Sequence, residues 1–151
     1  ENIKDKAKAT RDEVIEASKI VGSHEFIMTL PNGYDTILEE SGANISVGQR
    51  QLLSFARALL LDSKIFILDE ATSYIDSYTE RQIQNALDRV LENRTGIIIA
   101  HRLSTIKNAD KIIVLNKGEI VEIGNHEKLL SNKNLYWKLW SNNESSFDDL
   151  N

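Results

Sequence analysis

Two acidic residues directly follow an apolar segment of this chain. Asp69 and Glu70 come after the continuous apolar run at residues 65–68, whose composition is typical of a buried parallel strand. An aspartate at such a strand end suits Mg²⁺, which keeps most of its waters and takes one or two carboxylates besides phosphate oxygens. Glu70 points in another direction and could activate a water for in-line attack on a γ-phosphate. The alternative is an acidic pair that only ends a strand at the surface.

A histidine follows a second apolar segment in the same way. His101 comes after residues 95–100, which contain three consecutive isoleucines. An imidazole there could hydrogen-bond a γ-phosphate and hold the geometry of an attacking water. The alternative is a polar residue that only caps the end of a strand.

A polar turn that opens a helix is the third candidate. Ser46-Val47-Gly48-Gln49 has the pattern of a capping box, and a helix N-terminus binds phosphate through its free N–H groups and its dipole. Gly48 lets a backbone approach a ligand closely. The alternative is a capped amphipathic helix that binds nothing. Asp76 either adds an acid to the start of a later helix or reaches across an interface.

Composition narrows the class of protein. The 151 residues suffice for one domain with a core, and the hydrophobic fraction of 41% is ordinary for globular proteins. A formal net charge of −5 argues against nucleic acid as a partner, and the absence of cysteine excludes disulfides and thiolate metal sites. No apolar run approaches the ~20 residues that span a bilayer. The opening Glu1-Asn2-Ile3 reads like an internal stretch, so we expect a piece of a longer polypeptide.

Local patterns predict helices first and then alternating strands and helices. Capping boxes at Thr10, Ser46 and Ser77 each open a helix with apolar residues at helical spacing, and Gly22 closes the first of them. Further predicted elements are a short helix at 23–30, a turn at 31–33, a loop at 34–44, strands at 65–68 and 95–100, a short helix or turn at 102–108, a hairpin of strands 111–115 and 119–123, and a helical region after Asn125.

This order of elements predicts an α/β fold with a mostly parallel sheet and right-handed crossovers. Ligands of such sheets bind beyond the carboxyl ends of the strands, which is where Asp69, Glu70 and His101 fall. We expect three parts: a helical part at 1–62, the second half of an α/β core at 63–141, and a flexible acidic tail at 142–151.

Taken together, these motifs resemble the nucleotide-binding domain of ATP-binding cassette (ABC) transporters, from Glu1 to about Trp140. Residues 45–49 resemble the family's signature motif, usually Leu-Ser-Gly-Gly-Gln, and residues 50–59 fit its continuation. The other matching segments are 64–70 (the Walker B strand), 71–76 (the D-loop), 100–104 (the switch histidine) and 117–129 (the end of exporter-type domains).

The resemblance implies a partial P-loop NTPase core, the ABC ATPase core, with a helical signature subdomain. It implies that Asp69 organises Mg²⁺, that Glu70 activates water for ATP hydrolysis, and that His101 contacts the γ-phosphate. The implied enzyme is an ATPase whose hydrolysis of ATP drives export of a substrate across a membrane.

The resemblance also implies partners. Residues 46–49 (Ser46, Val47, Gly48 and Gln49) would contact the ATP held by a second nucleotide-binding domain in a head-to-tail homo- or heterodimer, and Asp76 would line that interface. A transmembrane domain would be the other partner, which places the chain at the cytoplasmic face of the cell membrane, without nucleic acid.

This chain departs from the family pattern at three places. It contains no Gly-x-x-x-x-Gly-Lys-Ser/Thr phosphate loop, so we expect the isolated chain to be inactive and its exposed sheet surface to favour aggregation. Ile45 and Val47 replace the usual Leu and Gly, and Ser41 replaces an arginine of the segment that touches the membrane domain in exporters.

Two other functions remain open at this point. One is a non-catalytic fragment that acts as a binding module and pairs with another cassette domain. The other is an ABC ATPase acting on DNA or ribosomes, although such proteins usually carry coiled-coil insertions or basic linkers, and neither is visible here.

Overall fold

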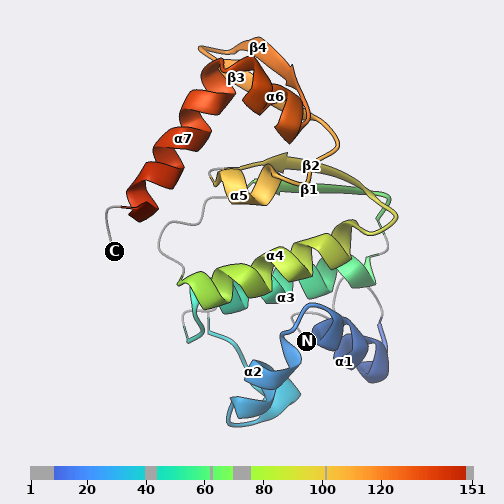
Figure 1. The fold of residues 1–151 in the computed structure, drawn as a ribbon. Helices are drawn as coiled ribbons and strands as arrows, with labels where there is room; N and C mark the ends of the chain where they lie inside the picture. Colours follow the sequence, from blue (N-terminus) through green and yellow to red (C-terminus); the bar gives the residue numbers. More distant parts are fainter. Residues whose placement is uncertain (1–8, 40–43, 62, 70–75, 101, 149–151) are drawn as a thin grey trace. The chain divides into compact units, whose positions relative to one another are not determined.

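The structure, a computed structural model, describes residues 9–39, 44–61, 63–69, 76–100 and 102–148. The chain divides into two compact units, Glu1–Ile99 and Ala100–Asn151, each described by itself below. The first unit contains α1 (Arg11–Ile20), α2 (His24–Thr29), η1 (Gly33–Asp35), α3 (Val47–Leu60), β1 (Ile65–Asp69), α4 (Ser77–Leu91) and β2 (Thr95–Ile99). The second contains α5 (Leu103–Ile106), β3 (Ile112–Asn116), β4 (Glu119–Gly124), α6 (His126–Asn132) and α7 (Leu135–Asp148) (Figure 1).

Helix α1 begins and ends where its local signals predict. Thr10 and Glu13 form both hydrogen bonds of the capping box, and Gly22 has a φ of 71°, the left-handed conformation that terminates helices. Val14 and Ala17 are buried as expected. Ile20, which shares the helical spacing of these residues, is half exposed.

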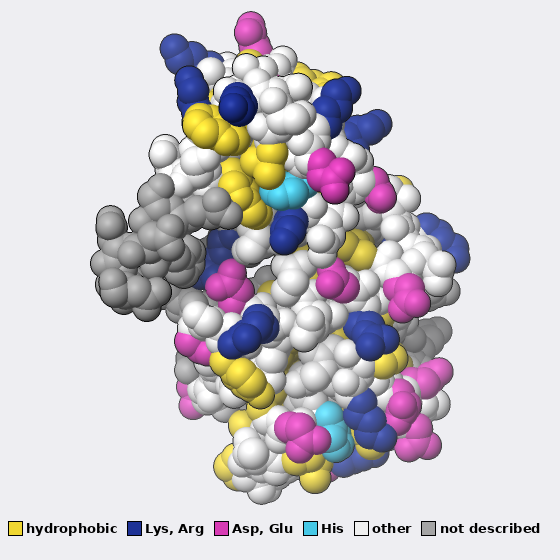
Figure 2. Space-filling view, viewed as in Figure 1, with side chains coloured by type: hydrophobic (Ala, Val, Ile, Leu, Met, Phe, Trp, Pro, Cys, Tyr) yellow, Lys and Arg dark blue, Asp and Glu magenta, His cyan; other side chains and the backbone are white. Residues whose placement is uncertain are grey.

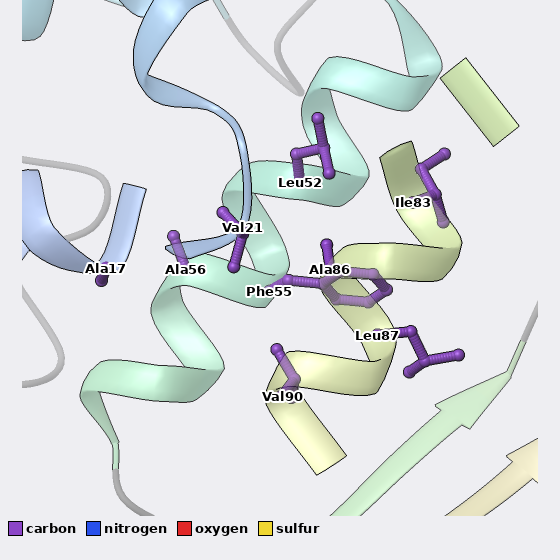
Figure 3. Packing of buried hydrophobic residues seen from close by; sticks show 9 residues of the cluster. All are labelled: Ala17, Val21, Leu52, Phe55, Ala56, Ile83, Ala86, Leu87 and Val90. Atoms are coloured by element: carbon purple, nitrogen blue, oxygen red, sulfur yellow. The ribbon is translucent and has the colours of Figure 1, made fainter. Parts of the chain in front are cut away.

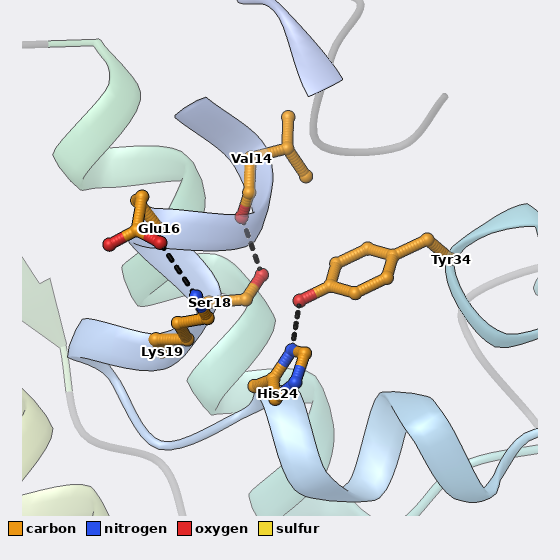
Figure 4. Close-up of polar contacts among 6 residues, drawn as sticks. All are labelled: Val14, Glu16, Ser18, Lys19, His24 and Tyr34. Atoms are coloured by element: carbon orange, nitrogen blue, oxygen red, sulfur yellow. Dashed lines mark hydrogen bonds and ion pairs between the residues drawn. The ribbon is translucent and has the colours of Figure 1, made fainter. Parts of the chain in front are cut away.

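Polar contacts fix α2 and η1 next to α1. The Ser23 hydroxyl, at the N-cap of α2, donates to the Ser18 carbonyl of α1 at 3.2 Å. His24 Nδ1 of α2 lies 2.8 Å from the Tyr34 hydroxyl of η1 (Figure 4). Arg11 adds a bidentate pair to Asp35 at 2.8 and 2.9 Å. These bonds hold the chain that leads toward α3.

The core of the first unit lies mainly between α3 and α4. Figure 3 shows their apolar side chains directed toward one another, with residues of α1 alongside. Phe55 is only 1% exposed, and its ring meets that of Phe66 on β1 edge-on at 6.0 Å between centroids. The cluster consists of Ala17, Val21, Leu52, Phe55, Ala56, Ile83, Ala86, Leu87 and Val90.

Helix α4 begins at a different cap from the one predicted. The sequence predicts Ser77 as the N-cap, and this is wrong. Asp76 has the extended conformation of an N-cap (φ −65°, ψ 156°), and its carboxylate accepts from the backbone N–H of Tyr78 and Thr79 at 3.1 and 3.0 Å. Ser77 therefore becomes the first helical residue, because the carboxylate one position earlier satisfies the free N–H groups.

Strands β1 and β2 form a parallel pair joined through α4, as the predicted α/β fold requires. Phe66, Leu68 and Ile98 pack against the core formed by α3 and α4. The described residues confirm the expected exposed sheet surface and depart from the full burial that the apolar run at 65–68 indicates. The opposite face carries isoleucines that are 52–66% exposed, namely Ile65, Ile67, Ile97 and Ile99.

This exposed isoleucine face leads to a prediction about association. In the 151-residue chain, Ile67→Thr should weaken self-association by about fivefold, because it keeps a β-branched residue in the strand but removes apolar area from the contact. Sedimentation velocity over a concentration series measures the effect. Ile20→Thr is the control, since Ile20 is similarly exposed on helix α1. Equal association of the two variants would contradict the prediction.

The second unit contains a hairpin whose core is shared with residues of α5, α6 and α7. Strands β3 and β4 pair antiparallel, which confirms the predicted hairpin. Its turn consists of Lys117 and Gly118, both at positive φ, because β3 extends to Asn116, one residue beyond the predicted strand. Asn125 caps α6 by accepting from the Lys128 N–H at 3.0 Å, as predicted. Burial raises the pKa of Tyr136, whose hydroxyl lies 2.9 Å from His126 Nδ1. Tyr136 forms the core of the second unit together with Ile112, Val114 and Leu129.

Helix α7 extends to Asp148, whereas the sequence predicts a flexible tail from residue 142. Neither proline nor glycine interrupts residues 142–148, so nothing in the covalent structure ends the helix earlier. Among the residues that the structure describes, no helix is long and apolar enough to cross a membrane. Basic and acidic side chains are interspersed over the face seen in Figure 2.

Candidate functional site

The structure describes six of the eight predicted site residues. Glu70 and His101 lie outside the described residues, as do residues 71–75 of the D-loop-like segment. The others come from the end of β1 (Asp69), the start of α3 (residues 46–49, called the α3 turn below) and the start of α4 (Asp76). All six belong to the first unit.

Asp69 is the last residue of β1, whereas the sequence predicts that it directly follows the strand, and its side chain is exposed. In the parallel register it pairs with Ile99, the last residue of β2, so both strands end at the same edge of the sheet. One accessible carboxylate at this edge fits the needs of Mg²⁺, which binds few protein ligands and retains water. Within the described ranges, no three His, Cys, Asp or Glu side chains gather into a metal-binding group.

The α3 turn is organised by its own side chains. The Ser46 hydroxyl accepts from the Gln49 N–H at 3.2 Å, and Gln49 Oε1 accepts from the Ser46 N–H at 2.9 Å. These are the two reciprocal bonds of a capping box, and they confirm the predicted start of the helix.

The residues that flank this turn anchor it to the unit. Ile45 is buried beside Ile27 and Leu53, and its carbonyl accepts from Arg50 Nη1 at 2.7 Å. The replacement of the family's leucine by Ile45 therefore preserves an apolar anchor. The α3 turn is thus fixed by the packing of Ile45 and by the hydrogen bonds between Ser46 and Gln49.

The outer side of the α3 turn is accessible and electrostatically suited to an anion. Ser46 is exposed, and Val47 is 43% exposed. The first turn of α3 contains no acidic side chain, so nothing there neutralises the positive end of the helix dipole. The first N–H groups of a helix have no intrahelical acceptor, which makes this end a suitable place for a phosphate.

Gly48 occupies a helical position and is buried, so its role here is to provide space rather than an unusual φ. A Cβ atom at this position would overlap with Cγ2 of Thr79 and would lie 3.6 Å from Cδ1 of Ile83. The close approach that the structure contains at Gly48 is thus to α4. A contact between Gly48 and a nucleotide stays a prediction.

Asp76 uses its carboxylate to cap α4, which matches the first of the two roles considered for it. Hydrogen bonding from Thr79, followed by that from Tyr78, holds the pKa of Asp76 below its usual range. The carboxylate is exposed and stays charged at neutral pH. A role at an interface stays a prediction.

Thr79 is a residue of this region that the sequence patterns did not single out. A threonine in the first turn of a helix is unremarkable by itself, and no local pattern couples it to Gly48. A glycine inside a helical pattern is the one signal that pointed to this contact, since it costs stability unless something approaches closely.

Comparisons with known proteins agree with the resemblance. The family profile described as ABC transporter matches residues 2–73. An ATP-dependent lipid A-core flippase of Syntrophus aciditrophicus is 54% identical over 127 residues, which are 84% of this chain and 21% of that protein. ABC transporter B family member 4 of Dictyostelium discoideum is 52% identical over 131 residues, 87% of this chain and 17% of that protein.

A bacterial relative without an assigned substrate matches over a longer stretch. The uncharacterized ABC transporter ATP-binding protein YfiC of Bacillus subtilis is 51% identical over 140 residues, 93% of this chain and 23% of that protein. The chain spans about a fifth of the length of these relatives.

Proposed function

The chain belongs to the ABC transporter family, and on this premise we propose that it forms part of an ATPase domain that powers export across a membrane. In this proposal the α3 turn contacts ATP held by a second nucleotide-binding domain. The predicted fold class, the exporter-type resemblance and the link to ATP agree with the matches to ATP-dependent flippases.

The observation that carries the proposal is the accessible and hydrogen-bonded start of helix α3. It is accessible, free of acidic side chains in its first turn, and fixed by the reciprocal bonds of Ser46 and Gln49. A rigid helix start with unneutralised positive potential is preorganised for a phosphate group, because no side chain has to be displaced or reordered when the anion arrives.

The catalytic part of the proposal rests on the edge of the sheet where β1 ends. Asp69 would hold Mg²⁺ there, and the ion would supply charge neutralisation on the phosphates. Glu70 would accept a proton from the attacking water, and His101 would donate a hydrogen bond to the γ-phosphate. Sequence position supports these roles, since each residue follows an apolar strand of the sheet.

The proposed partners are a second nucleotide-binding domain and a transmembrane domain. The relatives by name include flippases, and the chain covers only about a fifth of each. We place the chain at the cytoplasmic face of the cell membrane, with Asp76 lining the interface between two domains that pair head to tail.

Ser46→Ala tests the nucleotide role of the α3 turn. In the full-length polypeptide that carries this chain, it should lower kcat/KM for ATP hydrolysis by about 10- to 100-fold, the value of a lost hydrogen bond to a charged group. The measurement is steady-state hydrolysis over a range of Mg-ATP concentrations.

Thr10→Ala is the matched control. Thr10 is the N-cap of α1 in a capping box of the same chemistry, so its replacement removes the same kind of cap without a proposed nucleotide contact. If both variants lose activity equally, loss of the cap explains the effect, and the nucleotide role of Ser46 is wrong.

A further inference from the structure

The starts of α3 and α4 approach each other closely at Gly48 and Thr79. Gly48 lies in the first turn of α3 and is buried, and the space where a Cβ would stand is occupied by the Thr79 methyl group. Ile83, one turn further along α4, lies behind it. The methyl group thus fills a notch that exists because residue 48 has no side chain.

The Thr79 methyl cannot easily move out of this notch. Threonine is β-branched and has few allowed χ1 rotamers in a helix. Its backbone N–H donates to the Asp76 carboxylate at 3.0 Å, so the first turn of α4 is fixed relative to Asp76. The position of the methyl group therefore follows the position of Asp76.

The other side of the contact is equally constrained. Gly48 lies between Ser46 and Gln49, which are tied to each other by the bonds at 3.2 and 2.9 Å. A shift of Gly48 would move the whole α3 turn. Thr79 thus contacts the α3 turn at Gly48 and is bonded to the cap of α4 at the same time.

We propose that Thr79 is a positioning residue: its methyl group, seated over Gly48, sets the spacing between the α3 turn and Asp76. This inference rests on the proposed function, in which both groups face the nucleotide-containing interface of a paired domain. The methyl group carries the role at the α3 turn; the hydroxyl hydrogen-bonds the Asp76 carboxylate, which the Thr79 N–H holds as well. Loss of the methyl leaves room for the α3 turn to shift toward α4, and small misplacements of binding groups reduce their effect strongly.

Two substitutions at Thr79 separate the methyl from the hydroxyl. Thr79→Ser removes the methyl and keeps the hydroxyl, whereas Thr79→Val keeps a methyl at that position and removes the hydroxyl. In the full-length polypeptide, Thr79→Ser should raise the KM for Mg-ATP hydrolysis by about three- to tenfold with kcat within about twofold of wild type. Thr79→Val should keep the KM of the wild type.

A stability control separates positioning from general weakening. Ile112→Val removes one methyl group from a buried residue of the second unit's cluster, so it lowers stability without touching the α3 turn. It should leave KM unchanged even if its melting temperature falls as far as that of Thr79→Ser. If Ile112→Val and Thr79→Ser raise KM equally, the positioning role is wrong.

A methyl swap tests the contact itself. Gly48→Ala alone should lower the melting temperature, whereas Gly48→Ala combined with Thr79→Ser should lower it by clearly less than the sum of the two single changes. Additive effects would show that the two residues do not share the notch.

The outcomes distinguish the two proposals. If the wild-type polypeptide neither binds nor hydrolyses Mg-ATP, the proposed function fails. If it hydrolyses Mg-ATP, the function stands. The positioning role of the Thr79 methyl is then wrong if Thr79→Ser has the KM of the wild type, or if Thr79→Val raises the KM as much as Thr79→Ser does.

Discussion

Glu70→Gln in the full-length polypeptide should lower the rate of ATP hydrolysis by about 10²- to 10⁴-fold, the usual contribution of a general base. Glutamine has the shape of glutamate but cannot accept the proton of the attacking water. Affinity for Mg-ATP should remain, because the proposed metal ligand is Asp69. Single-turnover hydrolysis and equilibrium nucleotide binding, measured on the same preparation, report the two properties separately.

The control for this experiment is Glu92→Gln. Glu92 is exposed at the end of α4, and its replacement also removes one negative charge without touching the proposed site. Hydrolysis by this variant should equal that of the wild type. A Glu70→Gln variant that retains full turnover would exclude Glu70 as the base and leave the proposed mechanism without one.

Phe55→Ala should destabilise the first unit by about 3–5 kcal/mol, the cost of deleting a fully buried aromatic ring and leaving a cavity. The ring is 1% exposed, lies between α3 and α4, and meets Phe66 at 6.0 Å. These two helices carry the α3 turn and Asp76, so both candidate groups depend on this packing. Urea unfolding followed by far-UV circular dichroism measures the change in the free energy of unfolding.

Two further variants give smaller expected changes in the free energy of unfolding, with which that of Phe55→Ala is compared. Phe55→Leu keeps most of the apolar volume and should cost less than half as much as Phe55→Ala. Ile20→Ala removes an isoleucine that is half exposed, and should change the free energy of unfolding by less than about 0.5 kcal/mol. An effect of Phe55→Ala no larger than that of Ile20→Ala would mean that the ring is not part of a packed core.

Most signals confined to a few neighbouring residues were read correctly from the sequence, and the exception is the capping box at Ser77. The capping boxes at Thr10 and Ser46, the left-handed Gly22, the turn at Lys117-Gly118 and the cap at Asn125 all depend on the backbone within one turn of the residue concerned. Such local preferences operate in any tertiary context, which is why they define where these elements begin and end.

The candidate chemistry was also readable from sequence, since it depends on residue type and order. An acidic residue after an apolar strand and a polar turn before a helix are linear patterns. The parallel register of β1 with β2 confirms that such strands end at one edge. Roles for Glu70 and His101 stay predictions, because these residues lie outside the described ranges.

Only the tertiary structure decided which groups contact one another. The sequence contains no pattern that links Gly48 to Thr79, because they are brought together by the packing of α3 on α4 across residues that are distant in the chain. The same reason explains the uncovered isoleucine face of β1 and β2. A buried strand and a half-exposed one can share the same apolar sequence, and the difference is set by what packs against each face.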